Sequence, residues 1–314
     1  MQEPQRERKL RKYGRRSGWA LLLILACAIL FQSCLMDRRI RKEIADYPRD
    51  PLTGVIEGTE AVTLRPEKLE GPTSRTACLL IHGFLSSRKD YSDLGDRLVQ
   101  EGITVRLMRL PGHGTTEPDF AYQPDGALYK AVETEYNQLR KEFDRVYVAG
   151  FSMGGTLSTL LASREQVDRL VLIAPYYRVS YEWYYLLPAE AWQPLLSWAF
   201  PYLPRSDVFV KIKDRDQIGK FFIYHTLTTS GARQLLALGH MVRQPEVLQK
   251  VTCPVLMVHS KHDGAANPKA AEEAFNTFSS TDKQLVWFNN SDHMLLWDYD
   301  REEVKQTIVD FLKK

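Results

Sequence analysis

The sequence of 314 residues predicts an α/β fold, with a mostly parallel central sheet covered by helices on both faces. Two observations lead to this class. Short apolar runs typical of buried strands alternate along the chain with segments of helical spacing. One of these runs, residues 146–151, breaks into Gly150-Phe151-Ser152-Met153-Gly154 and then into helix-forming sequence. A strand, a sharp turn and a helix are the context in which a serine hydroxyl is pushed outward at the apex of a strained turn.

The expected elements follow one another in order from residue 55. A short β segment at 55–64 comes first, followed by strands at 77–81, 104–108, 146–151, 169–175, 253–259 and 284–288. Helices are expected at 90–101, 127–143, 156–163, 268–278 and 302–312. In open sheets of this kind, ligands bind beyond the carboxyl ends of the strands. Residues in the loops after strand ends are therefore the candidates for a functional site.

Composition and charge exclude several classes of function. Residues 1–16 hold seven Lys or Arg against two Glu, a balance of +5, so the formal net charge of +3 leaves −2 for the rest of the chain. The body has no basic excess, and we expect no nucleic-acid partner. The four cysteines show neither a disulfide framework nor a metal-ligand spacing. We expect no metal and no cofactor.

The N-terminus predicts attachment to a membrane. A basic segment at residues 1–17 precedes an apolar segment at 18–36, whose uninterrupted core from Trp19 to Phe31 has 13 residues. That core has the length of a signal-peptide core, whereas extension to Met36 reaches about the minimum for a membrane span. Two interpretations stay open: an uncleaved signal anchor, or an export signal that ends at Cys34 as in a bacterial lipoprotein.

We favour an orientation with the N-terminus inside and the folded body outside the cytoplasm, in the cell envelope, because a basic start before a short apolar core is typical of export signals. Residues 37–54 are charged, contain Pro48 and Pro51, and are interpreted as a linker. The body then comprises residues 55–314. The sequence indicates no oligomeric state.

A cap is expected within the body at residues 176 to about 250, where the alternation of strands and helices breaks off. Ten aromatic residues lie between 176 and 204, in a segment without strand periodicity. Core packing can account for any one of them. Their density as a group fits an apolar substrate pocket or a face that touches lipid.

The strand-end loops supply the partners that a nucleophilic serine needs. A serine hydroxyl requires a base, most often histidine, and the histidine requires a carboxylate that fixes its tautomer. Ser152, Asp263 and His293 each follow a strand end and are the candidate nucleophile, acid and base. Asp292 and Asp298 compete for the role of the acid. Asp292 is adjacent to His293 in sequence and is poorly placed to reach the far ring nitrogen, so Asp263 is preferred.

Acyl transfer also needs N–H donors for the oxyanion that forms on the substrate. The backbone N–H of Met153 is expected to be one donor, because it starts the helix after the serine. Phe84, in the loop after the strand at 77–81, is expected to supply the second. His82 and His113 lie in glycine-flanked turns near the site, for which a structural role is expected.

Taken together, these motifs resemble the α/β-hydrolase superfamily, and more narrowly the bacterial monoacylglycerol lipase and carboxylesterase group. The matching pieces cover residues 77 to 293 and include His82-Gly83-Phe84, Gly112-His113-Gly114, Gly150-Phe151-Ser152-Met153-Gly154 and Ser291-Asp292-His293. The resemblance implies a serine hydrolase that cleaves carboxylic esters of apolar acyl groups through an acyl-enzyme. A membrane-attached hydrolase with an apolar cap further suggests a lipid ester, such as a monoacylglycerol or a lysophospholipid.

Alternatives to this function stay open. Related sequences include thioesterases and other hydrolases, and a binding protein of the cell envelope on a non-catalytic hydrolase fold is a second class. The intact triad speaks against the binding protein. A dehalogenase or epoxide hydrolase with an aspartate nucleophile is disfavoured, because serine occupies the turn at residue 152.

Overall fold

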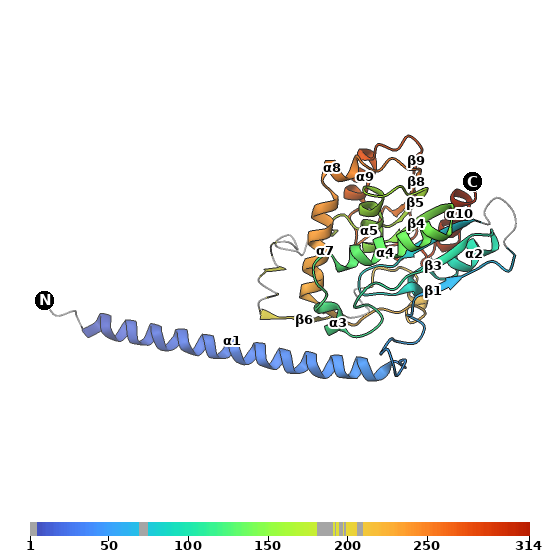
Figure 1. Cartoon of the computed structure of the whole chain (residues 1–314). Coiled ribbons are helices and arrows are strands. Elements are labelled where there is room, and N and C mark those ends of the chain that lie inside the picture. Colours follow the sequence, from blue (N-terminus) through green and yellow to red (C-terminus); the bar gives the residue numbers. More distant parts are fainter. Residues whose placement is uncertain are drawn as a thin grey trace.

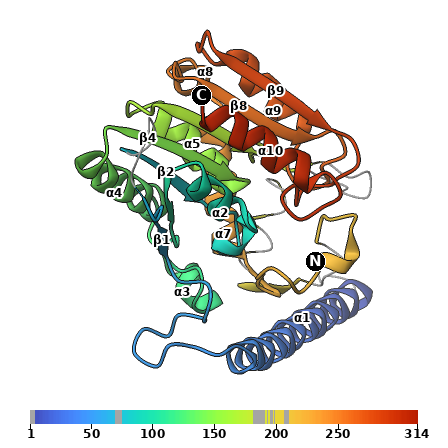
Figure 2. The same cartoon turned by 90° about the vertical axis from the view of Figure 1, so that its right-hand side faces the viewer.

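The computed structural model describes residues 5–68, 75–180 and 210–314, together with 191, 193, 194, 197 and 199–205. A seven-stranded sheet of order β1-β3-β2-β4-β5-β8-β9 forms its centre (Figures 1 and 2). The strands are β1 (Val62–Leu64), β2 (Thr76–Ile81), β3 (Thr104–Leu107), β4 (Arg145–Phe151), β5 (Arg169–Ile173), β8 (Val255–Ser260) and β9 (Lys283–Phe288). Only β1 runs antiparallel to its neighbour among these seven strands. This arrangement confirms the predicted α/β class.

Helices cover both faces of the sheet and enclose two apolar cores. One core contains side chains of α4 (Ala127–Glu142), α5 (Met153–Ala162), α7 (Thr229–Val242), α8 (Pro245–Leu248) and α9 (Pro268–Thr277). The other contains side chains of α2 (Leu94–Gln100) and α10 (Arg301–Leu312). Along β2, Leu79 and Ile81 belong to the first core, whereas Cys78 and Leu80 belong to the second. Because successive side chains of a strand point to opposite faces, a strand buried on both sides is a continuous apolar run.

The N-terminal helix α1 (Gln5–Asp46) is one continuous element that extends well beyond the α/β domain (Figure 1). The segment 37–54, expected as a linker, is helical over its first ten residues, because α1 continues to Asp46. The helix continues because of tertiary contacts. Met36, Ile40 and Glu43 are buried where α1 packs against two antiparallel strands, β6 (Tyr202–Pro204) and β7 (Thr226–Thr228). A helix with such a partner continues past its apolar stretch, although the charged sequence resembles a surface linker.

The middle of α1 is exposed and apolar. Seven large apolar side chains on it are exposed: Trp19, Leu23, Ile24, Leu25, Leu30, Phe31 and Leu35. Within the described part of the chain, no helix meets the combined requirements of length and apolar character for crossing a membrane.

The segment between β5 and β8 contains the predicted cap. Its described part includes a hairpin of β6 (Tyr202–Pro204) and β7 (Thr226–Thr228), a 3-10 turn at Arg215–Gln217, and α7. Of the ten aromatic residues, six lie outside the described residues: Tyr181, Trp183, Tyr184, Tyr185, Trp192 and Trp198. Tyr176 and Tyr177 are buried. The prediction of an apolar pocket thus rests mainly on residues that the structure does not describe.

Candidate active site

Ser152 occupies the tight turn between β4 and α5, with φ 53° and ψ −116°. A non-glycine residue in such a sparsely populated conformation costs about 1–3 kcal/mol, which the surroundings must offset. The flanking glycines allow the turn, because a Cβ on Gly150 would lie 2.2 Å from the carbonyl oxygen of Gly154. A Cβ on Gly154 would lie 1.8 Å from the carbonyl oxygen of Ile81. The Ser152 N–H donates to the Ile173 carbonyl (2.9 Å), which ties the turn to β5.

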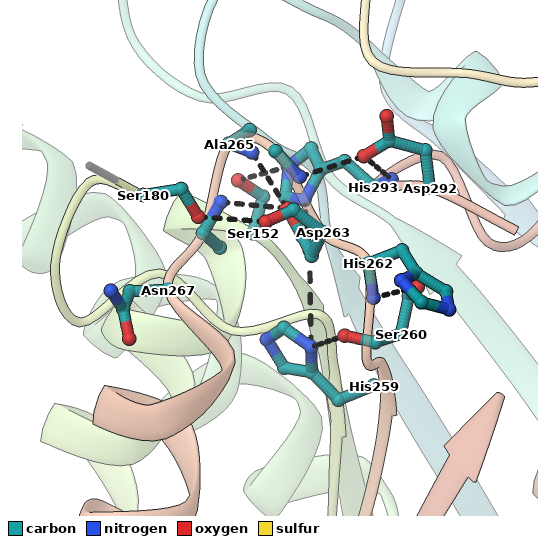
Figure 3. Close-up of polar contacts among 12 residues, drawn as sticks. Ser152, Ser180, His259, Ser260, His262, Asp263, Ala265, Asn267, Asp292 and His293 are labelled. Atoms are coloured by element: carbon teal, nitrogen blue, oxygen red, sulfur yellow. Dashed lines mark hydrogen bonds and ion pairs between the residues drawn. The ribbon is translucent and has the colours of Figure 1, made fainter. Parts of the chain in front are cut away.

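Ser152, His293 and Asp263 form a continuous chain of hydrogen bonds (Figure 3). The His293 Nε2 atom lies 3.0 Å from the Ser152 Oγ atom. On the other side of the ring, Nδ1 lies 2.7 Å from Asp263 Oδ2. The three residues follow β4, β8 and β9, and the carboxyl ends of parallel strands meet at one edge of the sheet. The structure therefore brings together the three side chains that the sequence singles out.

Asp263 is held so that one carboxylate oxygen is directed at the imidazole. Its Oδ1 accepts hydrogen bonds from the backbone N–H groups of Ala265 (2.8 Å) and Ala266 (2.7 Å). The Ser180 hydroxyl donates to the Asp263 carbonyl (2.7 Å), which fixes the backbone at the same point. With Oδ1 occupied by the loop, Oδ2 is the oxygen that remains for His293.

The two competing carboxylates have structural partners instead. Asp292 Oδ1 accepts from the backbone N–H groups of Gly264 and His293, both at 2.8 Å. Asp298 accepts from four backbone N–H groups, those of Lys213, Asp214, Asp292 and Tyr299. Both residues shape the loops around the imidazole, and the His293 ring bonds to Asp263.

The electrostatics of the pair favour an ionised acid and a basic imidazole. Burial alone would lower the pKa of His293, but the charge of Asp263 and its hydrogen bond raise that pKa above the ordinary value. Burial would raise the pKa of Asp263, but the attraction of His293 holds it below its ordinary value. The Phe151 ring packs beside the imidazole, with centroids 5.0 Å apart. Charge developing on His293 would thus be stabilised by a carboxylate shielded from water.

The loop after β2 lies directly against the serine turn. Gly154 lies against the Ile81 carbonyl, at the end of β2. In the loop itself, a Cβ on Gly83 would lie 3.1 Å from the Phe151 ring. Phe84 is in this loop, and Met153 is the first residue of α5. Their backbone N–H groups stay our prediction for the oxyanion donors.

His82 and His113 hold neighbouring loops together through backbone atoms. The Leu110 N–H donates to His82 Nε2 (3.1 Å), so Nδ1 carries the hydrogen directed at the Gly83 carbonyl (2.9 Å). The Leu85 N–H donates to His113 Nε2 (3.3 Å). Burial lowers the pKa of His82 to about 4, so the ring stays neutral and can accept. The predicted structural role fits both contacts.

Sequence reasoning missed Asp90, which supports the same loop. Its carboxylate accepts from the Gly83 N–H (2.8 Å) and from the Ser86 hydroxyl (2.5 Å). Burial raises the pKa of Asp90 to about 6. In the sequence this residue begins a helical pattern, and nothing there indicates a contact with the loop seven residues earlier. Among the described side chains, no group of His, Cys, Asp or Glu is arranged to hold a metal ion.

A serine at a strained strand-to-helix turn, bonded through histidine to a buried carboxylate, defines a serine hydrolase of the α/β-hydrolase class. The chain belongs to the family described as serine aminopeptidase, S33 (Hydrolase_4), whose model matches residues 72–300. The α/β-hydrolase fold expected from the motifs is confirmed by a solved structure reported for two metagenome-derived lipolytic enzymes, LipS and LipT. That structure has a TM-score of 0.71 and 25% identity, over 82% of this chain and 99% of the other.

Two curated bacterial proteins are similar to the chain over most of its length. A thermostable monoacylglycerol lipase from Bacillus sp. (strain H-257) is 30% identical, over 75% of this chain and 90% of the lipase. A carboxylesterase from Bacillus subtilis (strain 168) is 28% identical, over 81% of this chain and 98% of the esterase. The predicted class of enzyme, a serine esterase or lipase, is thereby confirmed.

Proposed function

We propose that this enzyme hydrolyses lipid esters with a single acyl chain, such as monoacylglycerols, through an acyl-enzyme on Ser152. The observation that carries the proposal is the unbroken hydrogen-bonded chain from the Ser152 hydroxyl through His293 to buried Asp263. The family description names an aminopeptidase, whereas the two curated relatives are named as ester hydrolases. Because one triad can serve both reactions, the similarity over most of the chain favours the ester.

Acylation follows from the geometry of the site. Ser152 Oγ attacks the ester carbonyl carbon while His293 Nε2 takes the hydroxyl proton. The negative charge that develops on the carbonyl oxygen faces the backbone N–H groups of Met153 and Phe84. The carbon–oxygen bond to the alcohol then breaks, and His293 returns the proton to the departing alcohol oxygen. Asp263 stays ionised throughout and keeps the imidazole in the productive tautomer.

Deacylation repeats these steps with water. His293 removes a proton from a water molecule, whose oxygen attacks the acyl carbon and forms a second oxyanion at the same donors. The bond to Ser152 Oγ breaks, the serine regains its proton from His293, and a carboxylic acid leaves. The net reaction consumes one water and one ester, and it produces one alcohol and one acid.

An acyl-chain series tests the proposed substrate class. We expect kcat/KM for monoacylglycerols to rise by roughly fourfold per methylene over short chains, because each buried CH₂ contributes about 0.8 kcal/mol. Triacylglycerols and thioesters with the same acyl groups serve as matched comparisons, measured by release of the fatty acid. Highest activity on acetyl esters would contradict an apolar acyl site. Faster turnover of thioesters would favour the thioesterase alternative.

We further propose that α1 attaches the enzyme to a membrane, with the catalytic domain outside the cytoplasm. The support is the set of seven exposed apolar side chains on α1 named above, with basic residues before and after them in the sequence. We expect the full chain to sediment with membranes and to stay there at high salt, whereas a variant lacking residues 1–36 should not. Intact mass after extraction distinguishes a complete chain from one that begins at a lipid-modified Cys34. Recovery of the full chain in the soluble fraction would overturn the proposal.

A further inference from the structure

The C-terminal part of α1 is connected to the β6–β7 hairpin by specific hydrogen bonds. Glu43 is only 7% exposed, and its Oε1 accepts from the backbone N–H of His225 at 2.7 Å. Its Oε2 accepts from the Thr226 hydroxyl at 3.4 Å. One turn earlier, the Arg39 guanidinium donates to the Arg205 carbonyl at 3.0 Å.

The neighbouring buried carboxyl group is Glu117, the first residue of α3 (Glu117–Ala121). Burial, with a further contribution from the adjacent Glu43, raises the pKa of Glu117 to about 8. The raised pKa favours the neutral form of Glu117, which lets the two carboxyl groups lie in one buried site. The nearby Arg49 charge acts in the opposite direction and lowers the pKa of Glu117.

The segment that Glu43 holds also binds the loop after β2. The Tyr224 N–H donates to the Leu85 carbonyl at 3.2 Å, and the Ser86 hydroxyl, whose one hydrogen also faces Asp90, lies 3.0 Å from the Phe222 carbonyl and shares that hydrogen with it. The N–H of residue 225 thus donates to α1, while the N–H of residue 224 donates to the loop that carries Phe84.

The residues just after α1 make a second connection to the same segment. The Tyr47 ring packs edge-on against Phe222, with centroids 5.2 Å apart. The Arg49 guanidinium donates to the Thr115 carbonyl at 2.8 Å, and the Thr115 N–H donates to the Tyr224 hydroxyl at 2.8 Å. Leu85 itself has φ 53°, so the loop depends on such contacts to stay in this conformation.

We propose that Glu43 is a positioning residue for the oxyanion loop, residues 83–86, and that α1 is thereby part of the catalytic apparatus as well as a tether. Glu43 acts through segment 222–226, which is hydrogen-bonded to Leu85 and Ser86, the two residues that directly follow Phe84. The inference rests on the proposed esterase function, because it concerns a donor used in that reaction. It applies equally to a chain processed at Cys34, since Glu43 lies beyond that point.

The test compares Glu43→Ala, Glu43→Gln and Asp37→Ala in the full chain. Asp37 is a matched control, because it lies on the same helix and its carboxylate is exposed and paired with Arg41. Active sites are titrated with a fluorophosphonate, so that kcat refers to folded enzyme only. We expect kcat of Glu43→Ala to fall about tenfold with KM little changed, since a loosened donor acts mainly on the transition state. Glu43→Gln should recover most of the loss, because its amide oxygen still accepts from His225.

Equal kcat per titrated site for Glu43→Ala and Asp37→Ala would overturn the proposal. A smaller fraction of titratable enzyme in Glu43→Ala, with kcat per titrated site unchanged, would show a role in folding alone and would also overturn it. If Glu43→Ala yields no titratable enzyme, Glu43→Asp takes its place. Its carboxylate is one methylene short of the His225 N–H, and its kcat should lie below that of Glu43→Gln. Equality of those two variants would likewise overturn the proposal. Failure of the esterase function itself is distinguishable, because the unaltered chain would then show no turnover.

Discussion

Replacement of Ser152 by alanine should lower kcat for ester hydrolysis by about 10⁶-fold, because no other group supplies the attacking oxygen. The hydroxyl makes its hydrogen bond to His293 Nε2 at 3.0 Å, and the turn is held by backbone contacts that alanine keeps. The variant should therefore fold normally. The measurement combines steady-state kinetics with labelling by a fluorescent fluorophosphonate, which should be lost completely.

The matched control is Ser163→Ala, at the opposite end of the same helix. The Ser163 hydroxyl donates to the carbonyl of Leu160 at 2.7 Å, far from the triad. Loss of this hydroxyl should therefore leave both labelling and turnover near the level of the unaltered chain. Peptide mapping of the labelled protein should find the probe on Ser152. A label on another residue, or full activity of Ser152→Ala, would contradict the assignment of the nucleophile.

Replacement of Asp263 by asparagine should lower kcat by roughly 10⁴-fold without removing any atom of the serine or the imidazole. The carboxylate accepts the hydrogen of His293 Nδ1 at 2.7 Å, so Nε2 is free to take the proton of Ser152. An amide group can instead donate to Nδ1, which would place the ring hydrogen on Nε2 and block the transfer. Steady-state kinetics per titrated site measure the loss.

The pH dependence of kcat/KM reports the same contact. His293 acts as a base only when neutral, and Asp263 raises the pKa of His293 above the ordinary value. In the unaltered chain, activity should therefore rise with pH through a midpoint above about 6.5 and be lost on acidification through it. Without the carboxylate, burial dominates and lowers the pKa of the imidazole. The residual activity of Asp263→Asn should have its midpoint at lower pH.

Asp292→Asn is the control for Asp263→Asn. The amide oxygen of the new side chain can still accept from the backbone N–H groups that Asp292 binds, those of Gly264 and His293. Its effect on kcat should be far smaller, although Asp292 is adjacent to His293 in sequence. Comparable losses in the two variants, or an unchanged midpoint in Asp263→Asn, would refute the assignment of the acid.

Most of the fold follows from local sequence patterns. Strands such as β2 and β8 are buried on both faces, so their continuous apolar runs are distinct from the surrounding helices. The observed helix ends differ from the predicted ones by a few residues. The helix predicted at 90–101, for example, is a 3-10 turn at Arg88–Tyr91 followed by α2. Residues 37–46 differ more from the expected local structure, because they are helical. Their charged sequence lacks a local signal for helix, and their partner is a hairpin more than 150 residues away.

The sequence by itself determined the chemistry of this protein, because a strained serine turn and a strand-end acid and base are local features that parallel strands carry to one edge of the sheet. Only the tertiary structure decided which carboxylate reaches the imidazole. Asp263, Asp292 and Asp298 all lie near His293, and backbone N–H groups occupy both oxygens of Asp298 and Oδ1 of Asp292, whereas the imidazole bonds to Oδ2 of Asp263. It also placed Asp90 against the loop after β2 and Glu43 against segment 222–226, which bonds to that loop. These contacts join residues that are distant in sequence or lie on different elements. No periodicity or spacing along the chain therefore predicts them.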